Sequence, residues 1–156
     1  MGELPVHGPT WIDTARLRNV VERRLAVDRD TVWARIADHE TWPEWFTALD
    51  RVRVTGEPAG VGGRREVTAG RITMGEVFTA WEPGEQFAFA IVRANRTLAG
   101  MAESVELRPD GDGCVVVYRQ GVEPARGFGW LWRLIMPRLR SETERALERL
   151  ETVATS

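Results

Sequence analysis

One long amphipathic stripe closes this chain, directly after a series of short segments with the period of β-strands. Beyond Pro124, apolar residues recur at helical spacing over more than five turns: Phe128, Leu131, Leu134, Ile135, Leu139, Ala146, Leu147, Leu150 and Val153. Pro137 lies within the stripe, so residues 129–136 are expected to form a separate helical segment or a kinked start. The apolar face of this helix must be buried, and a sheet formed by the preceding segments can cover it.

The preceding segments predict an antiparallel meander. Alternating or strand-like runs occupy residues 18–27, 49–55, 64–68, 72–81, 86–93, 98–107 and 114–122. The later runs are joined by short connections rich in Gly, Pro, Asn and Asp, as in hairpins. After the first run, Asp28 offers an N-cap for a short helix that ends near Asp38. We predict an α+β fold: a twisted antiparallel sheet of six or seven strands, two short helices after the first strand, and one long C-terminal helix.

An aromatic corner follows the first short helix. It places three large rings within six residues, Thr41-Trp42-Pro43-Glu44-Trp45-Phe46, which must be buried or bind something. Thr41 and Glu44 have the spacing of a capping box, and proline is tolerated in a first helical turn. The corner is therefore predicted to be one ordered helical turn.

In this order, the pieces resemble the START-like superfamily, also called Bet v 1-like or SRPBCC, and in particular its polyketide cyclase/dehydrase-like branch. The matching pieces are residues 20–27, the helix with Val32-Trp33 and Ile36-Ala37-Asp38, the Trp42-Pro43-Glu44-Trp45 corner, the Gly60-Val61-Gly62 turn, residues 79–83 and the C-terminal helix. The resemblance extends from about Arg18 to Val153. It implies a helix-grip fold, in which the sheet wraps around the long helix, with residues 1–17 as an N-terminal extension and 18–156 as a ligand-binding domain.

Composition excludes several classes of protein. The chain has 156 residues, enough for one domain with a sizeable core. Cys114 is the single cysteine and His7 and His39 are the only histidines, which excludes an internal disulfide and a cysteine-based zinc cluster, so neither a metal nor another cofactor is expected. All 21 basic residues are arginines, scattered among acids, which argues against nucleic-acid binding. Without a signal-like N-terminus or a membrane-length apolar run, we expect a cytoplasmic protein without stable membrane insertion, as a monomer or a homodimer.

A surplus of adaptable apolar side chains predicts a cavity for a hydrophobic small molecule. Phe87, Phe89 and Ile91 share one strand face, although each could simply pack the sheet against the helix. Together with the other large side chains they exceed what one helix can cover, and methionines and aromatics suit a ligand with rings or an acyl chain. The candidate ligand-binding residues are Trp42, Trp45, Phe46, Met74, Phe87, Phe89, Ile91, Met101, Trp130 and Met136.

Three residues are candidates for catalysis. Glu103 is in register with the apolar residues of its strand, so it either faces the interior, where burial raises its pKa, or turns to solvent at a bulge. Tyr118 either places its phenol in the cavity or is a core tyrosine with its hydroxyl at the rim. In the family that this chain resembles, cyclases are thought to orient a poly-β-keto chain with arginine, tyrosine and tryptophan side chains. Of the arginines expected near the cavity walls, Arg71, Arg93, Arg96 and Arg119, we name Arg71 by placement alone.

Three functions remain open from the sequence. The first is binding of a hydrophobic or aromatic small molecule, lipid or polyketide-like, in the cavity. The second is a polyketide aromatase/cyclase or dehydratase that acts in the same cavity, and the third is a protein-interaction module with this fold. Residues 127–136, with Trp130 and Trp132 among arginines, are expected at the pocket mouth; the alternative is an amphipathic segment on a membrane surface.

Overall fold

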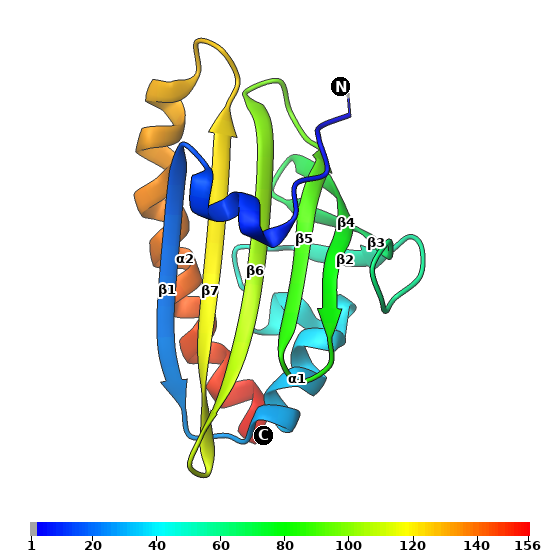
Figure 1. Ribbon diagram of the computed structural model, residues 1–156, viewed down its shortest axis with the longest axis vertical. Coiled ribbons are helices and arrows are strands. Elements are labelled where there is room, and N and C mark those ends of the chain that lie inside the picture. The colour runs from blue at the N-terminus through cyan, green and yellow to red at the C-terminus, as the bar shows by residue number, and fades with distance from the viewer. Residues whose placement is uncertain (1–2) are drawn as a thin grey trace.

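A seven-stranded antiparallel sheet forms the centre of the computed structural model, which describes residues 3–156 (Figure 1). The strand order across the sheet is β1-β7-β6-β5-β4-β3-β2. The strands are β1 (Leu17–Leu25), β2 (Arg51–Val54), β3 (Arg64–Ala69), β4 (Ile72–Glu82), β5 (Gln86–Arg93), β6 (Leu98–Asp110) and β7 (Gly113–Pro124). The helices are α1 (Arg29–Ala37) and α2 (Gly129–Thr155), with short 3₁₀ segments η1 (Pro9–Thr14) and η2 (His39–Glu44). The structure confirms the predicted α+β helix-grip fold.

The two short helices follow β1 as predicted, but their boundary signals differ. The Asp28 carboxylate accepts a hydrogen bond from the Thr31 amide at 3.2 Å, which confirms the N-cap of α1. The predicted capping box of Thr41 and Glu44 is wrong. The η2 turn begins earlier, at His39, so Thr41 already lies inside it and its hydroxyl donates to the Asp38 carbonyl at 2.8 Å.

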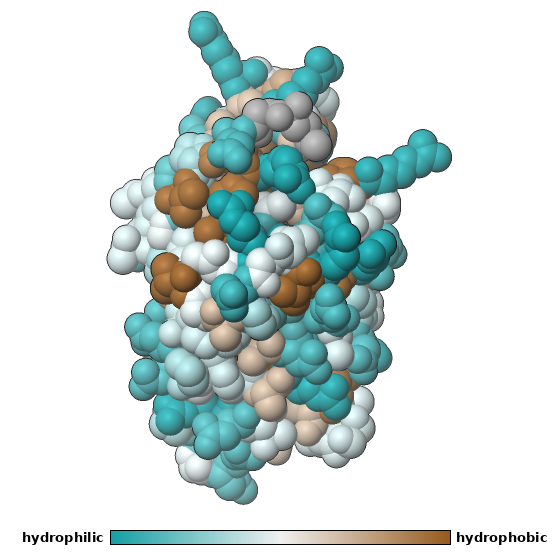
Figure 2. Space-filling model, turned by 90° about the vertical axis from the view of Figure 1, so that its right-hand side faces the viewer, coloured by the Kyte–Doolittle hydropathy of each residue, from teal (hydrophilic) through white to brown (hydrophobic). Residues whose placement is uncertain are grey.

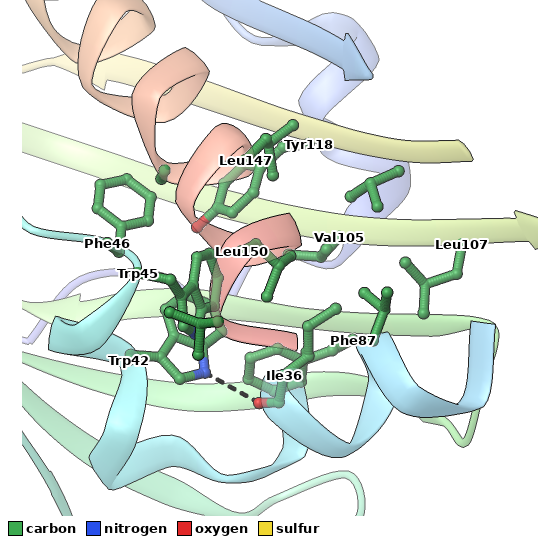
Figure 3. Packing of buried hydrophobic residues seen from close by; sticks show 14 of the residues in the cluster. Ile36, Trp42, Trp45, Phe46, Phe87, Val105, Leu107, Tyr118, Leu147 and Leu150 are labelled. Carbon is green, nitrogen blue, oxygen red and sulfur yellow. Dashed lines mark hydrogen bonds between the residues drawn. The ribbon is translucent and has the colours of Figure 1, made fainter. Parts of the chain in front are cut away.

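Helix α2 is continuous from Gly129 to Thr155, so the separate N-terminal segment predicted from Pro137 is wrong. A proline removes only one backbone hydrogen bond, that to the carbonyl four residues earlier, and the helix continues through it. The second half of α2 buries Ala146, Leu147, Leu150 and Val153, as expected. In Figure 3, Leu147 and Leu150 point into the buried cluster that also contains Trp42, Trp45 and Tyr118. No helix between residues 3 and 156 is long and apolar enough to cross a membrane.

The first half of α2 is packed less closely. Leu134, predicted to lie on the buried stripe, is instead 68% exposed. Three buried polar side chains mark the point from which the helix is fixed to the sheet. The Asn19 amide donates to Gln120 and to the Met136 carbonyl, and Gln120 donates to the Thr143 hydroxyl at 2.9 Å. These bonds satisfy groups that would be costly to bury alone.

The N-terminal segment crosses the outer face of the sheet, in front of β7, β6 and β5 (Figure 1). Ile12 is fully buried there, and the Leu4 amide donates to the Val92 carbonyl of β5 at 2.7 Å. Gly121 of β7 makes this close approach possible, because a Cβ at that position would lie 2.9 Å from the Cβ of Ala15 and 3.0 Å from the Cα of Ile12. The strands β5 to β7 are therefore buried on both faces.

Candidate functional site

A cavity of about 370 Å³ lies between the inner face of the sheet, η2 and the first half of α2. Most of its wall is apolar, as is usual for small-molecule sites, and its volume falls within their range. The apolar wall includes Trp42, Phe46, Leu49, Val67, Met74, Phe89, Ile91, Met101, Trp132, Ile135 and Leu139. The cavity lies beside the first half of α2, before the bonds of Asn19 and Gln120 fix the helix to the sheet; this half is anchored instead by the Trp132 indole, which donates to the Thr97 carbonyl at 2.9 Å.

The structure brings six of the ten predicted ligand-binding residues to this cavity: Trp42, Phe46, Met74, Phe89, Ile91 and Met101. Trp42 is held in place by its indole N–H, which donates to the Ile36 carbonyl at 2.9 Å (Figure 3).

Four predicted ligand-binding residues do not line the cavity. Trp45 and Phe87 are fully buried in the main core, where Phe87 packs against Phe78 and Trp81 on the side away from the cavity. Met136 is buried in a second apolar cluster beneath α2. Trp130 is 62% exposed, because the neighbouring face of α2, with Trp132 and Ile135, is the one that contacts the cavity. The prediction that these four residues line the cavity is therefore wrong.

A buried ion pair forms part of the cavity wall. Arg65 of β3 and Glu76 of β4 are directly opposite in the strand register, and the Arg65 Nε donates to a Glu76 carboxylate oxygen at 2.7 Å. Their side chains are only 1% and 3% exposed. The Arg65 guanidinium also lies 4.0 Å from the centre of the Trp42 ring, which adds a cation–π contact. Burial raises the pKa of Glu76, and the adjacent guanidinium opposes that rise.

His39 completes the environment of Arg65. The Arg65 Nη1 donates to His39 Nδ1 at 3.1 Å, and His39 Nε2 lies 2.7 Å from the Pro58 carbonyl. Because a guanidinium can only donate, Nδ1 must be the acceptor, and the imidazole is neutral with its proton on Nε2. Burial and the nearby Arg65 charge lower the pKa of His39 to about 4, which agrees with the neutral form. Sequence reasoning missed Arg65, Glu76 and His39 as site residues.

Glu103 and Tyr118 meet at the same wall. Glu103 is 8% exposed and Tyr118 is 1% exposed, and the Tyr118 hydroxyl donates to Glu103 Oε1 at 2.6 Å. Glu103 of β6 faces Gln120 across the strand pair, so Tyr118 reaches it on the diagonal. Burial raises the pKa of Glu103 to about 7, although the Tyr118 hydrogen bond partly offsets this. Of the two orientations that the sequence left open for Glu103, the structure has the inward one.

The arginines predicted near the cavity walls lie elsewhere. Arg71 is exposed in the turn between β3 and β4 and Arg96 in the loop after β5, and neither lines the cavity. Arg93 forms an ion pair with Glu66 at 2.9 Å, and Arg119 pairs with Asp13 of the N-terminal segment. Their placement was wrong because alternation turns these side chains to the outer face or the strand ends, whereas Arg65 points inward.

Comparison with known proteins identifies the family. A family model described as "Polyketide cyclase / dehydrase and lipid transport" matches residues 16–155. Uncharacterised proteins of Mycobacterium tuberculosis and Mycobacterium bovis are each 30% identical over 137 residues, which cover 83% of this chain and 81% of theirs.

Solved structures share the fold at low sequence identity. A protein of Thermus thermophilus matches with a TM-score of 0.76 at 19% identity, over 89% of this chain and 97% of that one. Ara h 8.0201 has a TM-score of 0.73 at 13% identity, with the same coverage of both chains. The ZhuI aromatase/cyclase of a Streptomyces species has a TM-score of 0.75 at 14% identity, over 89% and 94%. The chain adopts the Bet v 1-like fold and belongs to the polyketide cyclase/dehydrase and lipid transport family.

Proposed function

We propose that this protein binds an apolar small molecule, lipid or polyketide-like, that carries a carbonyl or hydroxyl oxygen. The observation that carries the proposal is the composition of the cavity wall, which is mostly apolar but has one buried polar group, where Arg65, Glu103 and Tyr118 converge. The other charged side chains of the wall are paired, Glu76 with Arg65 and Glu142 with Arg138. Aromatic and methionine side chains suit a ring system or an acyl chain. The family match supports a hydrophobic ligand in this cavity.

The polar wall gives the ligand an orientation. The hydrogen bonds of Arg65 to Glu76 and His39 use its Nε and Nη1, which leaves Nη2 to donate to a ligand oxygen. Such a donor is fixed in place by its partners and by Trp42, so little entropy is lost when it binds. A ligand without an oxygen leaves the guanidinium without this bond. We therefore expect a carbonyl compound to bind more tightly than the matching hydrocarbon.

Binding is tested with a neutral fluorescent naphthylamine and two competitors, 1-tetralone and tetralin. The probe should bind, and tetralone should displace it at about tenfold lower concentration than tetralin, because one charge-assisted hydrogen bond is gained. Ala48→Trp adds an indole at the cavity wall and should abolish probe binding. Val61→Trp, at a position 72% exposed in the loop before β3, is the matched control and should bind normally. Equal binding by both variants would place the probe outside the cavity.

One observation favours a second function, catalysis of cyclisation or dehydration. A carboxyl group with a pKa of about 7 exchanges its proton readily near neutral pH, and Glu103 has that pKa beside a tyrosine hydroxyl in an apolar cavity. A poly-β-keto chain whose carbonyl is held by Arg65 would present acidic CH₂ groups to Glu103. Glu103 would act as the base, and Tyr118 would stabilise its carboxylate.

The two functions are separated by Glu103→Gln, which keeps the side-chain volume and the hydrogen bond from Tyr118. If the protein is a cyclase or dehydratase, turnover of a poly-β-keto thioester should fall about 100-fold or more, while probe affinity changes little. The rate in the unmodified protein should rise with pH through an inflection near pH 7. Glu106→Gln is the control, since Glu106 lies on the same strand but pairs with Arg119 on the other face. Absence of turnover in the unmodified protein leaves ligand binding alone.

A further inference from the structure

A second apolar cavity adjoins the candidate site and lies toward one end of the molecule. It has a volume of about 350 Å³ and shares Ala69, Met74, Trp132 and Ile135 with the first cavity. It is bounded by Ile72 at the start of β4, by the loop after β5 and by the first turns of α2. Since Ile72 is 44% exposed, this cavity reaches the surface. The two adjoining cavities therefore place apolar walls between the candidate site and this end of the sheet.

Large apolar side chains stand exposed around this end. Trp130 is 62% exposed and Leu134 is 68% exposed, and their i, i+4 spacing places them on one face of α2. Ile72 lies across the second cavity from the helix. Single exposed apolar residues are ordinary, but here three lie at the end of the molecule where the second cavity opens. We call these three residues, with the arginines described next, the mouth surface.

Four exposed arginines surround these apolar side chains: Arg71, Arg96, Arg126 and Arg133. They come from the β3–β4 turn, the β5–β6 loop, the β7–α2 loop and α2, which the topology gathers at one end (Figure 1). Within residues 3–156, none of them forms an ion pair or a side-chain hydrogen bond, so no acidic side chain offsets their charges; Arg16, Arg51, Arg64 and Arg145 are likewise exposed and unpaired, whereas others pair with acids, as Arg108 does with Glu22. Figure 2 shows long polar side chains projecting from this upper end, with apolar atoms between them. The end is locally cationic although the chain has a net charge of −2.

We propose that the mouth surface binds the anionic phospholipid surface of a membrane as a peripheral contact. Tryptophan and leucine would enter the interfacial layer, and the arginines would contact lipid phosphates. An acidic protein partner would match the charge alone. A bilayer matches the charge, the exposed apolar tips and the apolar opening between them. The proposal does not depend on which ligand the cavity holds.

The test is co-sedimentation with vesicles of phosphatidylglycerol and phosphatidylcholine, compared with phosphatidylcholine alone. The protein should bind the anionic vesicles and not the neutral ones, and 0.5 M salt should weaken binding by screening. The triple variant Arg96→Gln/Arg126→Gln/Arg133→Gln should lower vesicle affinity about 100-fold, at about fivefold for each arginine. Trp130→Ser/Leu134→Ser should also lower it while leaving the salt dependence in place. All these positions are exposed, so the variants should fold.

Two control variants make the result specific to this end of the molecule. Arg145→Glu alters an exposed arginine of α2 that lies about 24 Å along the helix from its start, and Val61→Ser alters an exposed apolar residue of a distant loop. Both should bind vesicles normally. Failure of the unmodified protein to bind anionic vesicles would overturn the proposal and leave an acidic protein as the occupant. Equal loss in the control and mouth-surface variants would also overturn it.

Discussion

Removing one partner of the Arg65–Glu76 pair should be far more costly than removing both. Glu76→Leu leaves the Arg65 charge buried without its ion-pair partner, among a neutral imidazole, aromatic rings and the Glu103 carboxyl, which burial keeps from ionising readily. A buried charge stripped of its partner costs about 3–5 kcal/mol of unfolding free energy. For a domain of this size, that lowers the melting temperature by roughly 6–20 °C.

Removing the cation instead of the carboxylate should lower the unfolding free energy by a smaller amount. In Arg65→Met, Glu76 is left without its cation, but burial already raises its pKa, so the carboxyl can take up a proton instead of staying charged. Arg65→Met/Glu76→Leu should return to within about 1–2 kcal/mol of the unmodified protein, since apolar replacement of a buried pair is often near neutral. The four proteins form a double-mutant cycle that urea denaturation can measure.

An exposed ion pair provides the control for this cycle. Arg108 and Glu22 approach to 2.6 Å, with side chains 62% and 57% exposed, so Glu22→Leu should cost no more than about 1 kcal/mol. If Glu76→Leu also costs less than about 1 kcal/mol, water reaches the guanidinium. The account of Arg65 as a donor fixed in a dry cavity wall would then fail.

Two further predictions concern the helix and the acidic residue of the cavity. Leu147→Ala should lower the unfolding free energy by about 2–5 kcal/mol, because Leu147 is fully buried, while Leu134→Ala on the exposed first half of α2 should change it by less than about 0.5 kcal/mol; similar values in urea denaturation would contradict the described packing. Burial raises the pKa of Glu103 to about 7, so the folded state still holds a proton that the unfolded state loses near pH 4.5. The unfolding free energy should therefore fall by up to about 3 kcal/mol, through Glu103 alone, as the pH rises from 4.5 to 7. His39, with a pKa lowered to about 4, has the opposite effect between about pH 4 and pH 6.5, so the Glu103 effect is isolated by comparing the unmodified protein with Glu103→Gln in urea denaturation. The stability of the unmodified protein relative to Glu103→Gln should be constant below pH 4.5, fall between pH 4.5 and 7, and be constant again above pH 7. A difference that does not change with pH would refute the raised pKa.

The sequence predicts the inner faces of β5, β6 and β7 because their alternation is regular over most of their length; the register shift between β6 and β7 falls at the start of β6, between Leu98 and Gly100. It leaves β4 undecided for a physical reason. The pairing of β4 with β5 shifts register between Phe78 and Ala80, where Thr79 is the additional residue. A bulge of this kind changes which side chains face inward, so Phe78 and Trp81 both pack inside at a spacing of three. Alternation alone cannot locate such a shift.

The cationic part of the site escapes sequence reasoning for another reason. Arg64 and Arg65 are neighbours at the start of a short strand, and either could face inward. Val67 and Ala69 share the inner face with Arg65, but two apolar residues, one of them a small alanine, are a weak signal in a six-residue strand. His39 lies in a 3₁₀ turn without a useful period, and its role depends on a loop carbonyl 19 residues away. Only the register of β3 against β4 joins Arg65 to Glu76.

Because of the N-terminal segment, the start of the family match is not a suitable point at which to truncate the protein. The family model begins at residue 16, after the part of the segment that covers the outer face of the sheet. A protein that starts there would lose Ile12 and the backbone bond to Val92, and would expose the small residues of β5 to β7 as a flat surface. Such a surface can pair with that of a second copy. Expression of this protein for biophysical work should therefore retain the first 15 residues, because solubility is expected to depend on them.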